Sequence, residues 1–273
     1  SSSDVIHTLQ GKSGEIAHLD DIPTPSTPTS KTIWVDKTYG NNTTAIAYDE
    51  MRPYSTIVSA NSVAVSGDLI YIRPGVYSET VTLVDGVNYW ADGGVRVSRI
   101  TDDGNTVSCK WMGYGEIYYS GNNGLQINGN NTNLYLELDK LTTFGTVAIL
   151  DAKDININIK VNTVQGYCGN GGFVIRTYGR ENNINIEVGD MLPSNGIFST
   201  KGYAFTNSVK ALSVGRKWNS DIKVFDGILN MKVKRFISPK STSTSPIRWF
   251  PFSGVPWSVG EINIDIETVE CYH

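Results

Sequence analysis

The sequence predicts an all-β chain whose parallel strands stack as a β-helix (a solenoid), with a short N-terminal capping helix and an extended N-terminal arm. Three observations predict this fold. Short alternating strands are bounded by turn residues, a similar strand recurs along the second half of the chain, and clusters of helix-forming residues are rare. A chain of 273 residues is long enough for one large β domain with an appendage.

The N-terminal residues differ from the rest of the chain. They end in Pro23–Ser30, where three prolines alternate with hydroxyl residues, and such a segment is extended and semi-rigid. We therefore expect three parts: an arm and linker over residues 1–30, the entry and capping coil over 31–110, and coils with loop insertions over 111–273.

Strand-like segments begin after this linker. Ile33–Val35, Leu69–Ile72 and Thr80–Leu83 are each bounded by Gly, Pro, Asp or Asn. Between the first two, apolar residues of Tyr54–Val65 fall near helical spacing. We expect one short helix there, covering one end of the strand stack.

A recurring strand dominates the second half of the chain. In each copy aliphatic residues take every second position, so one face is buried and the other points outward. The copies are Asn133–Leu138, Asp154–Ile159, Asn183–Val188, Asp221–Val224 and Glu261–Ile266. The shorter apolar segments Val147–Leu150 and Phe173–Ile175 lie between copies, and the spacing between copies grows. This is typical of a solenoid with loops on one side.

Parallel stacking at ~4.8 Å would place like residues above one another. Asn156, Asn185 and Asn263 would then form an outward column whose amides can hydrogen bond to one another. An antiparallel β-sandwich also uses alternating strands and Gly-rich turns. It explains the repeated Asn-Ile pattern less well, because its strands face different partners.

A more specific pattern lies near the start of the predicted stack. The spacing Gly-Asp-x-Ile-x-x-x-Pro-Gly-x-Tyr-x-Glu runs from Gly67 to Glu79, after Val35–Asn41 and Arg52–Ile57. Together these segments resemble the opening of pectin-lyase-like β-helix domains in bacteriophage tail fibres and tailspikes. The resemblance implies a right-handed β-helix whose first coil is closed by a short helix. It also implies tight turns at Gly67 and Gly75, with Pro74 stiffening one of them.

The same resemblance implies a virion surface protein: a trimeric fibre or tailspike that presents a rigid surface to a host glycan or protein. Its arm would attach it to other virion proteins. Because the matching residues are architectural, the resemblance transfers a fold and no active site. We expect no cofactor and no metal. Two alternatives remain open, a polysaccharide depolymerase (glycoside hydrolase or lyase) of the same fold and a head-decorating or purely structural fibre.

Composition narrows the partners. The formal net charge is −4, the pI is about 5.4, and no run of Lys or Arg could follow a phosphate backbone, so nucleic acid is not an expected partner. Neither a signal peptide nor a membrane span is expected. Cys109, Cys168 and Cys271 show no metal-ligand spacing, and we interpret them as small buried hydrophobic residues.

A glycosidase needs two carboxylates on one face. Glu137 and Glu187 fall in one predicted outward column, about two strand spacings (~9.6 Å) apart, with Asn158 between them and Phe225 and Asp265 further along. The simpler interpretation is that these carboxylates only keep the outer face solvated.

Other chemical signals are weaker. His7, His18 and His273 lie near the two ends, so neither a Ser/His/Asp triad nor a histidine metal site is expected. Asp102–Asn105 lacks the further acids of a calcium loop, and Gly169–Gly172 precedes a strand rather than a helix, so both are interpreted as turns.

The segment Pro246–Trp257 is the strongest binding candidate, because it concentrates aromatic residues. Aromatic rings stack on the apolar faces of sugars, and aromatic residues with Arg also dominate protein interfaces. The segment could contact a receptor, or it could join subunits or cap the distal end. The candidate residues are Arg248, Trp249, Phe250, Phe252 and Trp257.

Overall fold

The described part of the chain is one parallel sheet. The computed structural model describes residues 31–121, 123–144, 148–150, 154–166, 173–175, 179–193, 212–214, 225–238, 247–249 and 261–271. Within them, 17 strands join a single sheet, and every strand pairing is parallel. The antiparallel β-sandwich is therefore wrong, and the all-β parallel architecture is confirmed. The predicted arm, residues 1–30, lies outside the described residues.

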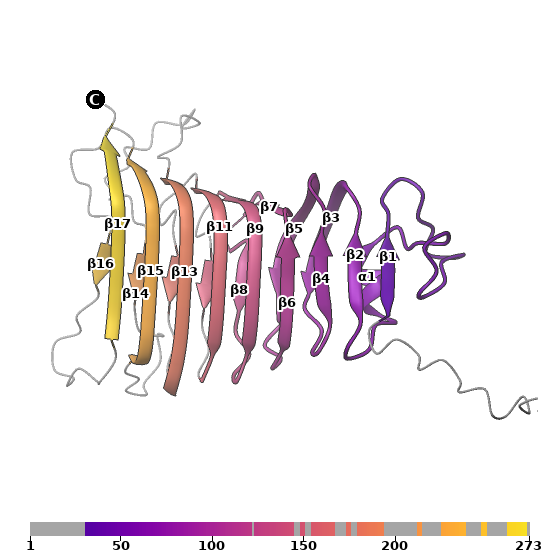
Figure 1. Cartoon of the computed structure of the whole chain (residues 1–273), viewed down its shortest axis with the longest axis horizontal. Helices are drawn as coiled ribbons and strands as arrows, with labels where there is room; N and C mark the ends of the chain where they lie inside the picture. The colour runs from indigo at the N-terminus through magenta and orange to yellow at the C-terminus, as the bar shows by residue number, and fades with distance from the viewer. Residues whose placement is uncertain are drawn as a thin grey trace, which may run out of the picture.

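The first ladder of paired strands runs the length of the sheet, with its strands side by side from the N-terminal end to β17 (Figure 1). Its strands, in order, are β1 (Thr32–Val35), β2 (Leu69–Ile72), β4 (Asn88–Ala91), β6 (Ser108–Gly113), β9 (Asn133–Thr143), β11 (Asn156–Gly166), β13 (Gly179–Pro193), β15 (Phe225–Ser238) and β17 (Glu261–Cys271).

Two further ladders complete the sheet. The second consists of β3 (Gly75–Thr82), β5 (Val95–Thr101) and β7 (Glu116–Tyr119), and β7 then pairs with the second half of β9. The third consists of β8 (Leu125–Ile127), β10 (Ala148–Leu150), β12 (Phe173–Ile175), β14 (Leu212–Val214) and β16 (Ile247–Trp249). It joins the same sheet because β8 also pairs with the end of β5. Because β6 and β7 both pair with β9, each long strand from β9 onward carries the positions that two strands hold earlier in the chain.

The predicted repeats are present, but two of their starting points are wrong. β11 begins at Asn156, which pairs with Asn133, so the anchor predicted at Asp154 is two residues too early. Two strands further along the first ladder lies β15, in which Ile228 pairs with Asn183. The anchor predicted at Asp221 is therefore also wrong, and residues 221–224 lie outside the described residues. The predicted short strand Phe173–Ile175 is β12.

One inward column of the first ladder forms a continuous part of the core. Its members are at most 2% exposed: Ile33, Ile70, Tyr89, Trp111, Leu136, Ile159, Ile186 and Met231. The Tyr89 and Trp111 rings stack with their centroids 5.3 Å apart. Cys109 is buried nearby as a free thiol, and burial raises its pKa to about 12. Cys109 is thus the small buried residue that was predicted, whereas the side chains of Cys168 and Cys271 lie outside the described part.

The predicted helix is present, shorter than its sequence pattern. α1 (Ile57–Asn61) lies at the N-terminal end of the stack and contributes Ile57 and Ala60 to the core (Figure 1). The Thr56 hydroxyl caps it by accepting a hydrogen bond from the Ser59 N–H. Glu79 accepts hydrogen bonds from the N–H groups of Ile57 and Val58, so the last residue of the Gly67–Glu79 pattern holds the helix against β3.

The remaining residues of the Gly67–Glu79 pattern are also architectural. Gly67 has a φ of +96°, which glycine adopts without strain, and this confirms a turn at that position. Asp68 is buried and accepts hydrogen bonds from the Val65 N–H and the Tyr48 hydroxyl. Gly75 is the first residue of β3 rather than part of a tight turn. Glycine is required there because a Cβ would lie 2.6 Å from the Cβ of Lys37.

Candidate functional site

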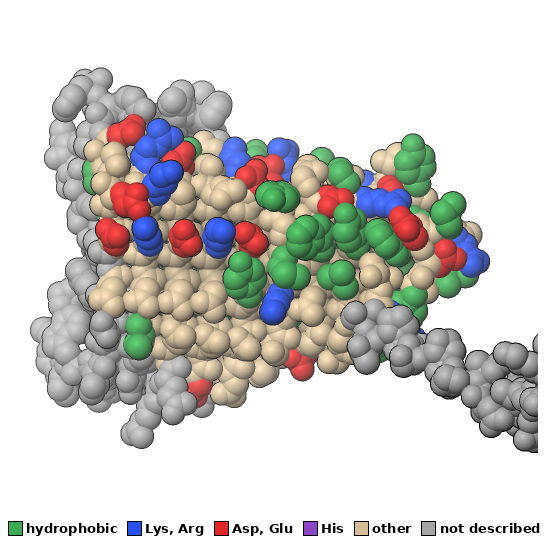
Figure 2. Space-filling view, viewed as in Figure 1, with side chains coloured by type: hydrophobic (Ala, Val, Ile, Leu, Met, Phe, Trp, Pro, Cys, Tyr) green, Lys and Arg blue, Asp and Glu red, His purple; other side chains and the backbone are tan. Residues whose placement is uncertain are grey.

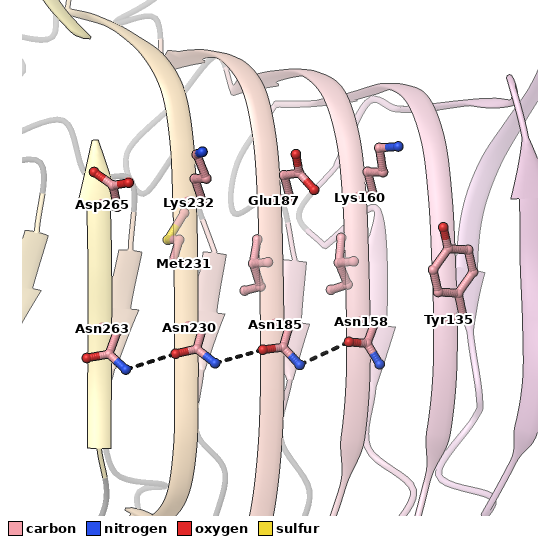
Figure 3. Close-up of a pocket in the computed structure, with 12 residues that line it drawn as sticks. Tyr135, Asn158, Lys160, Asn185, Glu187, Asn230, Met231, Lys232, Asn263 and Asp265 are labelled. Carbon is pink, nitrogen blue, oxygen red and sulfur yellow. Dashed lines mark hydrogen bonds between the residues drawn. The ribbon is translucent and has the colours of Figure 1, made fainter. Parts of the chain in front are cut away.

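Hydrogen-bonded asparagines form an outward column along the second half of the first ladder (Figure 3). Each amide nitrogen donates to the side-chain oxygen one coil earlier: Asn185 to Asn158 at 2.9 Å, Asn230 to Asn185 at 2.8 Å, and Asn263 to Asn230 at 2.9 Å. Tyr135 occupies the same column on β9. Four strands, β11, β13, β15 and β17, are therefore tied together by side chains as well as through their backbones.

The composition of this column corrects the prediction. Asn156 was expected beside Asn185 and Asn263, but it belongs to a second, parallel column. There Asn156 donates to Asn133 at 3.0 Å, and Asn183 donates to Asn156 at 3.1 Å. Asn185 also donates to Asn183 at 3.3 Å, so the two columns are cross-linked.

Beside the asparagines runs a column in which charges alternate, visible as a row of acidic and basic side chains (Figure 2). The register places Glu137, Lys160, Glu187, Lys232 and Asp265 at equivalent positions. Glu137 and Glu187 do lie two coils apart in one outward column, as predicted. The residue between them is Lys160 rather than Asn158, and the expectation of Phe225 in this column is wrong because Lys232 holds that position.

The two lysines of this column have different partners. Lys160 Nζ lies 3.4 Å from Glu137 Oε1, and its hydrogen bond to Glu137 raises the lysine pKa. Lys232 Nζ lies 2.9 Å from Glu267 Oε1, a residue two positions along β17 from Asp265. This hydrogen bond raises the pKa of Lys232 and lowers that of Glu267. Exposed pairs of this kind contribute little stability, so their main effect is to balance charge on the face.

A shallow groove lies between the asparagine column and the charged column (Figure 3). Ile159, Ile186 and Met231 separate the two columns in sequence, and all three side chains are buried in the core. The floor of the groove is therefore largely backbone, and its borders are amides, carboxylates and ammonium groups. Such a surface offers hydrogen-bond donors and acceptors repeated at about the strand spacing of ~4.8 Å.

No family model, curated protein or solved structure matches the chain. Any functional proposal for the chain therefore rests on the geometry of its own residues.

The first half of the same outward column has a different chemistry. In the register of the charged column, β1, β2, β4 and β6 place Trp34, Tyr71, Trp90 and Met112. Apolar side chains gather on this part of the face (Figure 2). Sequence reasoning missed this row. The available signal was that each aromatic residue alternates with buried residues, so that Trp34 lies between Ile33 and Val35.

The predicted binding residues fall in a part of the chain that the structure describes only as backbone or not at all. Arg248 and Trp249 lie on β16, opposite Ser213 and Val214 of β14. Their side chains, and the residues Phe250, Phe252 and Trp257, lie outside the described part. Receptor contact and subunit contact at this segment both stay predictions.

The two turn interpretations have different outcomes. Asp102 is fully buried and accepts hydrogen bonds from the N–H groups of Gly104, Asn128 and Gly129, so the Asp102–Asn105 segment is a turn tied to the next coil. Residues 169–172 lie outside the described part, as do His7, His18 and His273. Among the described residues, no group of three or more His, Cys, Asp or Glu is placed to hold a metal ion. None of their helices has the length and apolar character to cross a membrane.

Proposed function

We propose that the chain is a right-handed parallel β-helix that serves as a rigid surface module of a bacteriophage fibre or tailspike and binds a host-surface glycan. The observation that carries this proposal is the continuous parallel register of the first ladder, from β1 to β17.

The order of the strands supports a solenoid. From β2 onward, neighbours on the first ladder are separated in sequence by one or two strands of another ladder, as β10 separates β9 from β11. Parallel neighbours need a crossover connection, and a crossover that lays its own strand on a separate ladder is one coil of a β-helix. Crossovers between parallel strands are right-handed in about 98% of cases, which supports the proposed hand.

Rigidity is the proposed mechanism of display. The asparagine columns add side-chain hydrogen bonds to the backbone ladders, so one coil cannot move without breaking contacts to both neighbours. A homotrimer would multiply weak contacts to a repetitive host surface. Trimerisation, the virion location and attachment through residues 1–30 are part of the proposal and are supported by the resemblance carried by Gly67–Glu79.

The chemistry of the outward face supports a glycan as ligand. Its amides and balanced charges are suited to the hydroxyl groups of a sugar polymer, and the net charge of −4 disfavours nucleic acid.

The depolymerase alternative receives no support from the candidate carboxylates. A glycosidase acid needs surroundings that favour a protonated carboxyl. Lys160 lies between Glu137 and Glu187, and its ammonium is 3.4 Å from Glu137, so the two carboxylates lie in a column of charged groups rather than in the apolar surroundings of such an acid. We expect purified protein to release neither reducing ends nor unsaturated sugars from bacterial surface polysaccharides. Release that disappears in both Glu137→Gln and Glu187→Gln would replace our proposal with the enzyme.

The proposal is tested by measuring glycan binding and the molecular mass of the protein in solution. We expect the full chain to be trimeric by light scattering and to bind at least one polysaccharide on an array of purified bacterial surface glycans, at a dissociation constant in the micromolar to millimolar range. A trimer that binds no glycan on the array would favour the purely structural fibre. A monomer that binds none would overturn the proposed function altogether.

A further inference from the structure

The aromatic row on the N-terminal coils has its own polar border. Two residues after each of Trp34, Tyr71 and Trp90, the chain places Asp36, Arg73 and Asp92; Asp36 is buried, whereas Arg73 and Asp92 are partly exposed. The aromatic residues themselves are half-buried, with the Trp34 and Tyr71 ring centroids 4.8 Å apart. An apolar strip thus runs next to a strip of charged groups.

Asp92 is fixed by the aromatic row. The Tyr71 hydroxyl donates to its two carboxylate oxygens at 2.8 and 2.9 Å, and Trp90 Nε1 donates to Oδ1 at 3.2 Å. The hydrogen bond to Asp92 also raises the pKa of Tyr71, so the phenol remains a donor at neutral pH. A carboxylate has about four acceptor positions, so Asp92 keeps capacity for further donors beside the rings.

Arg73 orders the other end of the strip. Its guanidinium lies over the Trp34 ring, 5.2 Å from the centroid, and forms ion pairs with Asp36 and Glu50. The cation is therefore shared between two carboxylates and a ring. Three carboxylates, those of Asp36, Glu50 and Asp92, outnumber this one guanidinium. A further cation, Lys110, lies on the adjoining outward column of β6.

This combination points to a class of ligand. Aromatic rings pack against the apolar faces of sugars, and fixed carboxylates accept hydrogen bonds from sugar hydroxyls. The excess of carboxylates repels acidic sugars. The same excess opposes a second copy of this patch, which would bring like charges together. A neutral glycan offers hydroxyl donors without that repulsion.

We propose that Trp34, Tyr71 and Trp90, together with Asp92, form a binding platform for a neutral, hydroxyl-rich glycan. This inference rests on the proposed function and gives it a place on the N-terminal coils, separate from the Arg248–Trp257 candidates. Trp90, which lies at the end of the row beside Asp92, provides the main stacking surface, and Asp92 orients the sugar.

The test uses the full chain on an array of neutral and acidic bacterial surface polysaccharides, followed by titration calorimetry with the neutral polysaccharide that binds best. We expect Trp90→Ala to weaken binding about ten-fold or more, the loss expected when a ring stacked on a sugar is removed. Asp92→Asn removes the charge but keeps the shape, and we expect a loss of about five-fold. Tyr114→Ala is the matched control, because Tyr114 is an exposed aromatic residue outside the row.

Each outcome supports or overturns the platform. The platform is supported if the wild type binds a neutral glycan, if Trp90→Ala and Asp92→Asn weaken this binding, and if Tyr114→Ala leaves it unchanged. Thermal unfolding of Asp92→Asn near the wild-type temperature then shows that the loss is local. Neutral glycan bound equally by all variants overturns the platform and leaves the proposed function standing. Binding of acidic polysaccharides alone overturns the ligand class. Loss of the oligomer in Trp90→Ala with unchanged glycan affinity assigns the row to a second copy instead.

Discussion

The two halves of the first ladder have the same inward chemistry and opposite outward chemistry. From Ile33 to Met231 the inward column stays apolar, whereas the outward column beside it changes from Trp34, Tyr71 and Trp90 to the alternating charges that begin at Glu137. The change falls between β6 and β9, where Met112 gives way to Glu137. Stacking thus constrains one side of each strand, and the other side can differ from strand to strand.

The largest expected effect is on the inward column at this junction. Trp111 is fully buried and stacks on Tyr89, so we expect Trp111→Ala to lower the free energy of unfolding by about 3–5 kcal/mol in a denaturant titration. Trp90, on the outward side of the preceding strand β4, is half-buried, and Trp90→Ala should lower the free energy of unfolding by less than half as much. Equal losses for the two variants would contradict the division between inward and outward columns.

A second variant at the same position sharpens this comparison. The Trp111 Nε1–H is buried and has no hydrogen-bond partner among the described residues. Trp111→Phe removes that unpaired donor together with part of the ring, so its loss of stability should be clearly smaller than that of Trp111→Ala.

An intermediate effect is expected on the asparagine column. Asn185 donates to Asn158 and Asn183 and accepts from Asn230, so Asn185→Ala should lower the free energy of unfolding by about 1–2 kcal/mol. Asn133 makes one such bond, as acceptor from Asn156, and Asn133→Ala is the matched control with a smaller loss. If both variants unfold at the same denaturant concentration as the wild type, the asparagine hydrogen bonds do not contribute to stability.

The smallest effect is expected in the charged column. The hydrogen bond from Lys232 lowers the pKa of Glu267, so the pair contributes above the usual carboxyl pKa and its contribution is lost as pH falls through the lowered value. In an NMR titration, Glu267 should titrate below an ordinary glutamate and return to the usual range in Lys232→Met. The pair is exposed, so the stability of Lys232→Met should stay close to that of the wild type.

The sequence predicted the strand type better than its register. Alternation in Asp154–Ile159 marks which residues face inward, and a one-residue error would have reversed them. A two-residue error preserves the alternation, and for this reason the pattern predicts Asp154 rather than Asn156 as the equivalent of Asn133. In the structure Asn156 donates a side-chain hydrogen bond to Asn133, a contact between strands that alternation alone does not encode.

The aromatic row was harder to foresee for a related reason. Trp34, Tyr71 and Trp90 come from strands without a common sequence, so no repeat marks them as neighbours. By contrast, the Gly67–Glu79 spacing is local, and its predicted architectural role matches the contacts of Asp68 and Glu79.

The fusion of two strand positions into one long strand has a consequence for how this protein can change. β9 pairs with both β6 and β7, and its successors continue both faces without a break in the chain. An insertion within such a strand would disturb two ladders at once. By contrast, we expect insertions between described strands, such as between Pro193 and Leu212 or between Ser238 and Ile247, to leave both ladders in register, so a foreign peptide grafted there should not change the scaffold.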